Sequence, residues 1–150
     1  MKRLFGLVFA AAMLLNARAE TGWVTSFDQA TQQAKKENKA VLMDFTGSDW
    51  CSFCMKLKKN VFDTPEFNKF AEKNLVLMEV DFPQKKKQSP ELKAANAKLN
   101  KKYEIEGYPS IFVVNSEGKT LGSLVGYDGE TPSEYIAKLE KIIAKDKPAK

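Results

Sequence analysis

The chain has 150 residues, of which 43% are hydrophobic and 29% charged, a balance that is typical of one folded domain and excludes a disordered chain. Its formal net charge is +5, but three basic residues lie within the first 19, so the remainder carries about +2 and a nucleic-acid-binding function is not favoured. There is no histidine, which excludes Ser-His-Asp and Cys-His catalytic arrangements and removes the commonest metal ligand.

The first 19 residues have the pattern of an export signal. A basic start and an apolar run over 4–15 precede Ala17-Arg18-Ala19, which has the small residues that signal peptidase reads. We therefore expect a signal peptide over 1–19 and a single domain over 20–150. The alternative is an uncleaved membrane anchor, for which the apolar run is short, because about 20 residues are needed to span a bilayer.

Apolar periodicity and capping residues predict alternating helices and strands along the rest of the chain. The expected elements are helix 26–38, strand 40–46, helix 51–60, a helix beginning at Thr64, strand 75–82, helix 89–102, strands 110–114 and 119–125, and helix 131–145. Ser26-Phe27-Asp28-Gln29 and Thr131-Pro132-Ser133-Glu134 both have the spacing of a capping box. This order predicts an α/β fold with a central mixed β-sheet flanked by helices.

The two cysteines lie in Cys51-Ser52-Phe53-Cys54, directly after the strand 40–46 and a turn. A disulfide that closes so short a loop adds little stability, so redox chemistry explains the pair better. A helix that begins at Cys51 would favour its thiolate, which is the species that attacks a disulfide, and Cys54 follows one turn later. A zinc or copper site is the alternative, but no further cysteine or histidine exists to complete it, so we expect no metal and no cofactor.

Two motifs resemble the thioredoxin superfamily over residues 23–145. They are Trp50-Cys51-x-x-Cys54 after an apolar strand and Gly107-Tyr108-Pro109-Ser110 before the next one. The resemblance implies the thioredoxin fold, a cis Pro109 against the cysteine pair, and a Tyr108 whose backbone binds an extended substrate segment. The amino-acid sequence around Trp50 is also similar to that of exported bacterial thioredoxin-like reductases and isomerases.

The same resemblance gives roles to three more side chains. Asp44 matches the buried acid behind the second cysteine, where burial would raise its pKa and let it take the proton from Cys54. The alternative is a polar core residue satisfied by hydrogen bonds. The buried lysine of the family has no counterpart, because Leu77 stands at its position. Trp50 is expected to shield one side of the pair, with simple core packing as a compatible alternative. Phe53 is expected to be exposed and to contact apolar surfaces of client proteins.

The function expected from these residues is thiol–disulfide exchange with exported proteins, in the periplasm if the cell is a diderm bacterium. Ser52-Phe53 brings no charge to the thiolate, which favours a reductase, with an isomerase second and an oxidase third. A redox-inactive module that binds clients is an alternative from another class. The expected partners are exported proteins with disulfides and a membrane thiol–disulfide electron donor, and we expect a monomer that binds no nucleic acid. The run Lys85-Lys86-Lys87 receives no functional interpretation from the sequence.

Overall fold

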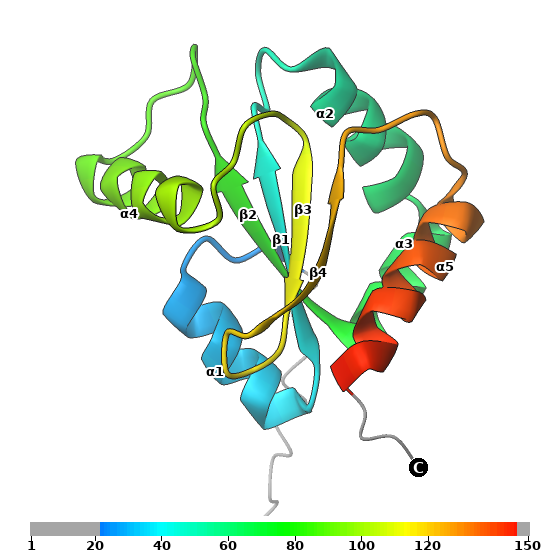
Figure 1. Cartoon of the computed structure of the whole chain (residues 1–150). Coiled ribbons are helices and arrows are strands. Elements are labelled where there is room, and N and C mark those ends of the chain that lie inside the picture. Colours follow the sequence, from blue (N-terminus) through cyan, green and yellow to red (C-terminus); the bar gives the residue numbers. More distant parts are fainter. Residues whose placement is uncertain (1–21, 147–150) are drawn as a thin grey trace, which may run out of the picture.

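The computed structural model describes residues 22–146, so the expected signal segment 1–19 lies outside the described residues. Over residues 22–146, five α-helices surround one sheet (Figure 1). The helices are α1 Phe27–Glu37, α2 Ser52–Leu57, α3 Pro65–Asn74, α4 Pro90–Lys102 and α5 Pro132–Ile143, with a π-helical turn Lys58–Phe62 after α2 and a 3-10 turn Ala144–Asp146 after α5. No helix in the described part of the chain is long and apolar enough to cross a membrane.

The sheet has four strands in the order β2-β1-β3-β4, and it is mixed as expected. The strands are β1 Ala40–Thr46, β2 Leu75–Asp81, β3 Ser110–Val114 and β4 Thr120–Val125. β1 pairs with β2 in parallel and with β3 antiparallel, and β3 and β4 form an antiparallel hairpin. This topology is the α/β thioredoxin fold that the motifs predicted. Most strand and helix ends lie within two residues of the predicted positions, but α2 ends at Leu57, three residues before the predicted end, where the π-helical turn begins.

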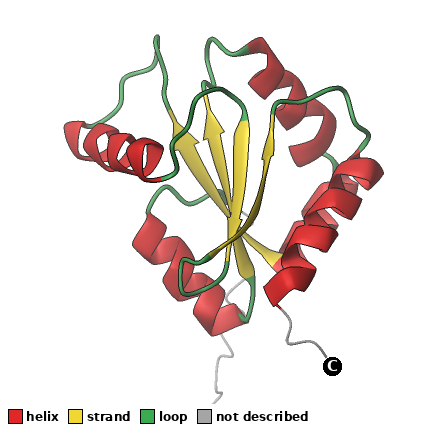
Figure 2. Ribbon diagram, in the orientation of Figure 1, coloured by secondary structure: helices red, strands yellow, loops and turns green. Residues whose placement is uncertain are grey.

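Helices cover both faces of the sheet, which gives three layers (Figure 2). Side chains alternate between the two faces along each strand. Leu42 and Leu77 point to the face covered by the π-helical turn, α3 and α5, where they join Phe67 and Tyr135. Val41 belongs to the cluster on the opposite face, which α1 and α4 cover. The central strand β1 is buried along its whole length, so its end is a rigid base for the turn that carries the cysteines.

The helix starts follow the capping residues. Ser26, Thr64, Ser89 and Thr131 each accept a hydrogen bond from the backbone N–H three residues later. Thr131 and Glu134 form the full reciprocal capping box. At α1 only one of the two hydrogen bonds of the predicted capping box forms. The backbone N–H of Gln29 donates to the Ser26 hydroxyl at a long 3.4 Å, but the Gln29 side chain makes no hydrogen bond to the Ser26 backbone.

Candidate active site

The cysteine pair lies at the carboxyl end of β1, where α2 begins. Cys51 and Cys54 are joined by a disulfide, and both are largely buried. Cys51 is the N-cap of α2 rather than its first residue, a correction to the predicted start, because its sulfur accepts a hydrogen bond from the N–H of Cys54 at 3.2 Å. In the reduced protein this sulfur is a thiol or thiolate. An amide that points at it, together with the positive helix end, favours the thiolate.

Aromatic side chains surround the pair. Phe53 is 54% exposed and Trp50 is 39% exposed. The indole N–H of Trp50 donates to the carbonyl of Phe82 at 2.8 Å, and its ring meets Tyr108 edge to face at 5.7 Å. Gly47 makes room for this ring, because a Cβ there would lie 2.3 Å from it. The indole is thereby held in place over the turn that precedes the cysteines.

The loop with the proline approaches the same end of the sheet. Ser110 pairs with Phe45 near the end of β1, and Pro109 immediately precedes it. The Tyr108–Pro109 peptide bond is cis, as the resemblance implied. The Pro109 carbonyl accepts from the N–H of Gly126 at 2.8 Å, and the Tyr108 hydroxyl accepts from the Asn100 amide at 2.8 Å. These bonds fix the loop from both of its sides.

Asp44 is the only ionisable residue of β1, and it points to the face that holds Leu42 and the π-helical turn. Its side chain is buried, and burial raises its pKa from 3.8 to about 8, with Glu79 and Asp81 adding to the effect and Lys58 opposing it. Its Oδ1 atom has no hydrogen-bond partner among the described residues. This carboxyl is therefore buried without a protein partner for that oxygen within residues 22–146.

Two further carboxyls share that face, and sequence reasoning did not single them out. The parallel register sets Glu79 beside Asp44 and Asp81 beside Thr46. Burial is also the main cause that raises the pKa of Glu79. Asp81 accepts from the Ser48 N–H at 2.9 Å and from its hydroxyl at 2.5 Å, so it ties the end of β2 to the turn before the cysteines. The alternation of acids in the β2 sequence was the available signal.

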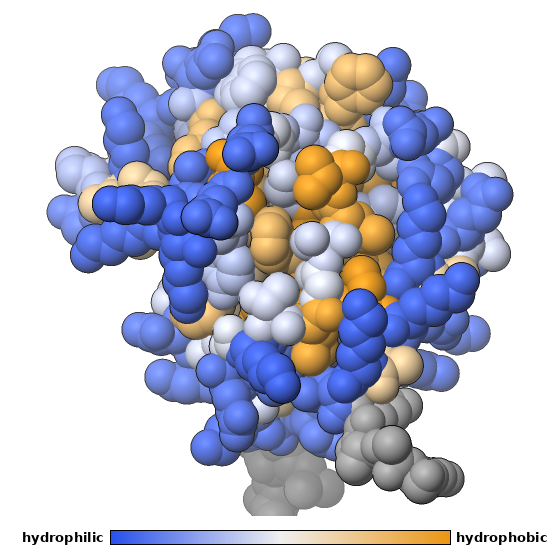
Figure 3. Space-filling view, in the orientation of Figure 1, coloured by the Kyte–Doolittle hydropathy of each residue, from blue (hydrophilic) through white to orange (hydrophobic). Residues whose placement is uncertain are grey.

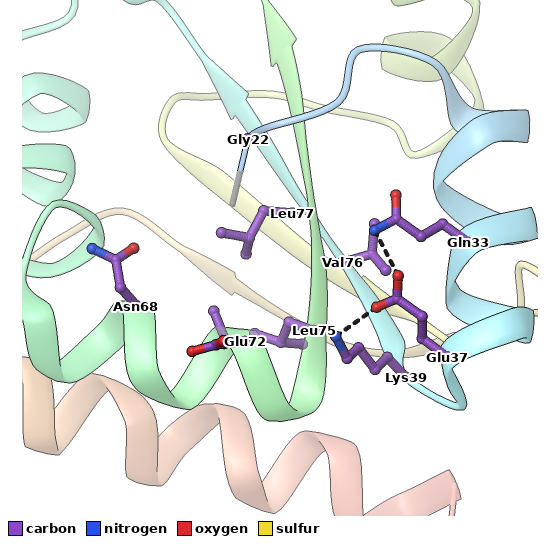
Figure 4. Close-up of a pocket in the computed structure, with 10 residues that line it drawn as sticks. Gly22, Gln33, Glu37, Lys39, Asn68, Glu72, Leu75, Val76 and Leu77 are labelled. Carbon is purple, nitrogen blue, oxygen red and sulfur yellow. Dashed lines mark hydrogen bonds and ion pairs between the residues drawn. The ribbon is translucent and has the colours of Figure 1, made fainter. Parts of the chain in front are cut away.

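A separate pocket lies at the opposite end of the sheet, beside the start of β2 (Figure 4). There the Glu37 carboxylate accepts from Gln33 at 3.0 Å and from Lys39 at 2.5 Å, and the Lys39 bond is the main cause that lowers the pKa of Glu37. Glu37 and Lys39 are thus paired with each other, and the pocket does not include the cysteines. Over residues 22–146, no group of three or more potential ligand side chains is arranged to hold a metal ion.

Comparisons with known proteins agree with this geometry. A family model described as a thioredoxin-like domain matches residues 27–143. The disulfide bond reductase DsbH of Chlamydia pneumoniae is 33% identical over 127 residues, which are 85% of this chain and 75% of that protein. The thioredoxin-related protein DsbJ of the same organism is 28% identical over 83% of this chain, but this match spans only 36% of DsbJ.

Solved structures show the same fold. A structure of a DsbH oxidoreductase superposes with a TM-score of 0.75 at 32% identity, over 81% of this chain and 83% of the other. A thioredoxin from Thermus thermophilus superposes with a TM-score of 0.63 at 20% identity, over 82% of this chain and 87% of the other, a likeness of fold alone.

Proposed function

The chain belongs to the thioredoxin-like family and is a thiol–disulfide oxidoreductase that uses the Cys51–Cys54 pair, and we propose that it works as a reductase of exported proteins. The main support for the proposal is the position of this pair. Cys51 caps α2 at the end of β1, the buried strand that contains Asp44. The relative DsbH, which is named a disulfide bond reductase, supports the direction.

The exchange starts from the reduced pair. The Cys51 thiolate attacks one sulfur of the substrate disulfide, so a mixed disulfide forms and the other substrate sulfur leaves as a thiolate that takes a proton from water. Cys54 then loses its proton, and its thiolate attacks the Cys51 sulfur. The second substrate sulfur leaves and is protonated in turn. The substrate is thereby reduced by two electrons, and the Cys51–Cys54 disulfide is the oxidised product.

Asp44 supplies the base for the second step. A carboxylate with an ordinary pKa of 3.8 is too weak a base to take a proton from a thiol, whose pKa is about 8.5. With its pKa raised to about 8, the carboxylate is nearly matched to the thiol, which is the condition for efficient proton transfer. Glu79 and Asp81 help to create this match, because their charges disfavour the ionised form of Asp44.

The surface around the cysteines binds the substrate chain. Trp50 and Phe53 offer exposed aromatic area, and Met55 and Val125 are exposed at 45% and 72%. Figure 3 shows the strongest hydrophobic colour in the middle of this face, along β4, and paler hydrophobic colour above it near α2. The backbone of Tyr108, next to the cis Pro109, pairs with the extended segment that carries the substrate disulfide.

The direction follows from what surrounds the thiolate. Ser52 and Phe53 lie between the cysteines and bring no positive charge, so the stabilisation of the Cys51 thiolate comes mainly from the helix end. A less stabilised thiolate favours the disulfide form of the enzyme, which makes the pair a reductant. In an oxidising compartment such a pair must be reduced again, and a membrane thiol–disulfide protein is the proposed donor.

Export completes the proposal. Residues 1–19 would direct the chain out of the cytoplasm and be removed, and residues 20–150 would act as a monomer in the periplasm of a diderm cell. N-terminal sequencing of the protein recovered from a periplasmic extract tests this, with a first residue of Glu20 expected. A protein that still begins at Met1 and stays with the membrane fraction would show that the segment is an anchor.

The reduction potential of the Cys51–Cys54 couple tests the redox direction. Equilibration of the purified protein with dithiothreitol or glutathione buffers is expected to give a value near that of thioredoxin, about −270 mV. A value of about −120 to −180 mV would instead assign an oxidase or isomerase. If these buffers do not reduce the disulfide in the folded chain, the reductase proposal fails, and a redox-inactive module that binds clients takes its place.

Trapping experiments test the roles of the two cysteines. A Cys54→Ser variant is expected to hold client proteins as mixed disulfides with Cys51, because the resolving thiol is missing. A Cys51→Ser variant serves as the matched control and is expected to trap none. Equal trapping by both variants would contradict the assignment of Cys51 as the nucleophile.

A further inference from the structure

The loop that joins β2 to α4 is bound to the turn that carries the cysteines. Asp49, two residues before Cys51, accepts hydrogen bonds from three successive backbone N–H groups of this loop. They come from Gln84 at 2.9 Å, Lys85 at 2.7 Å and Lys86 at 2.8 Å. These bonds, with the Gln84 N–H as the largest cause, lower the pKa of Asp49 and keep it ionised. The loop is therefore held at a fixed position beside the active site.

Two further bonds join the same segments. The Trp50 indole donates to the carbonyl of Phe82, where the loop begins, and the Lys86 ammonium donates to the Ser48 hydroxyl at 3.1 Å. In Figure 1 the loop between β2 and α4 rises at the same end of the molecule as α2. Residues about 35 positions apart in sequence thus form one continuous rim beside the turn that precedes the disulfide.

This rim is basic. Lys85, Lys86 and Lys87 are all exposed, and no carboxylate in the described part of the chain lies within ion-pair distance of them. Lys86 acts electrostatically on Asp49 and Glu79, the two acids that face it. The charges of Lys85 and Lys87 remain available to a partner.

A fourth cation lies on α2, two residues after Cys54. The Lys56 ammonium sits 5.4 Å from the centre of the exposed Phe53 ring. Apolar contact area at the centre with charges at the edge is the arrangement of a protein-binding surface. The charges at such an edge act mainly on the rate of association and on the choice of partner.

We propose that the Lys85–Lys87 loop selects disulfide-containing polypeptides that carry acidic side chains next to their disulfide. This inference rests on the proposed reductase function and adds a substrate class to it. The loop attracts the acidic segment, and Trp50 and Phe53 then contact the apolar part of the same segment. Asp49 acts as a positioning residue, because it holds the loop at the edge of the site. A polypeptide is the partner favoured over an anionic membrane, since only about +2 of net charge remains outside the first 19 residues.

Matched peptide substrates test the proposal. Three peptides with the same small disulfide loop, flanked by glutamates, glutamines or lysines, are compared by kcat/KM for reduction at low ionic strength. The acidic peptide is expected to react about fivefold faster than the neutral one, and the basic peptide more slowly. The preference should disappear at about 0.5 M salt, where charges are screened over about 4 Å.

Two double variants separate the loop from general surface charge. Lys85→Gln with Lys87→Gln is expected to remove most of the preference for the acidic peptide and to leave reduction of uncharged hydroxyethyl disulfide unchanged. The control, Lys69→Gln with Lys73→Gln, removes two exposed lysines of α3 and is expected to keep the preference.

Equal rates for the acidic and neutral peptides, or equal losses in the two double variants, would overturn the inference while leaving the reductase function intact. So would a loop variant that loses binding to phosphatidylglycerol vesicles but keeps its preference among the peptides. Failure of the unmodified protein to reduce hydroxyethyl disulfide would instead refute the proposed function. The two failures are therefore distinguishable.

Discussion

Replacement of the Asp44 carboxyl by an amide is expected to change how the stability of the oxidised protein depends on pH. The folded protein holds the proton of Asp44 up to a pH of about 8, whereas the ordinary pKa is 3.8. Between these values the unfolded chain has released the proton and the folded chain has kept it. Unfolding therefore releases a proton, and the free energy of unfolding falls as pH rises through this range.

The size of the effect follows from the two pKa values. Each factor of ten in the acid dissociation constant is worth about 1.4 kcal/mol, so a rise from 3.8 to about 8 corresponds to roughly 6 kcal/mol. This is comparable to the whole stability of a small domain. In Asp44→Asn the largest part of the slope should be lost. A smaller slope of the same sign should remain, because the pKa of Glu79 is also raised, mainly by its burial.

Urea unfolding of the oxidised protein, followed by tryptophan fluorescence at pH values of about 5, 7 and 9, measures the slope. The Asp44→Asn variant is expected to be more stable than the unmodified protein at the highest pH, where the unmodified protein must carry a buried charge. Asp28→Asn, at an exposed position of α1, is the control and should follow the unmodified protein. A stability that is flat with pH, or an Asp44→Asn variant with an unchanged slope, would refute the reasoning.

Three further predictions concern packing and local geometry. Phe67→Ala leaves a cavity at a fully buried position of the core. It is expected to lower the free energy of unfolding, measured by urea titration, by about 3–5 kcal/mol. A loss below about 1 kcal/mol would contradict the close packing at this position. Thr131→Ala removes the N-cap of α5 and should lower the free energy of unfolding by about 1 kcal/mol in the same titrations. An unchanged urea midpoint would mean that the Glu134 side chain alone is enough to cap the helix. Gly47→Ala places a Cβ where the Trp50 ring lies and should displace the indole. Red-shifted tryptophan fluorescence and slower disulfide reduction are expected. An unchanged fluorescence spectrum would show that the turn adapts to the added methyl group.

The sequence predicted the elements well where local chemistry determines them. Ser89 and Thr131, each followed by a proline, begin helices at the predicted positions, because a cap and a proline at the first turn act within a few residues. The start of α2 was wrong by one residue. The Cys51 sulfur acts as the cap, a role that oxygen-bearing side chains usually fill.

The parts of the site that were missed depend on pairing between distant segments. Asp44 was identified from the resemblance, but Glu79 and Asp81 join it only through the register of β1 with β2. A shift of that register by one residue would turn both acids to the other face of the sheet. The contact between Asp49 and the loop after β2 likewise spans about 35 residues, and nothing in the local sequence signals it.

The two edges of the sheet differ in how they are protected. Along β2, Val24 forms a parallel bridge with Met78, and its N–H and carbonyl bond to Leu77 and Glu79 at 2.9 Å each. This short segment, which we call a strap, occupies backbone hydrogen-bonding groups of β2 that could otherwise pair with a strand from another molecule. β4 carries no such strap among the described residues, and the exposed Val125 lies at its end. Self-association of the concentrated protein through strand pairing is therefore expected to begin at β4, and a charged residue in place of Val125 should suppress it.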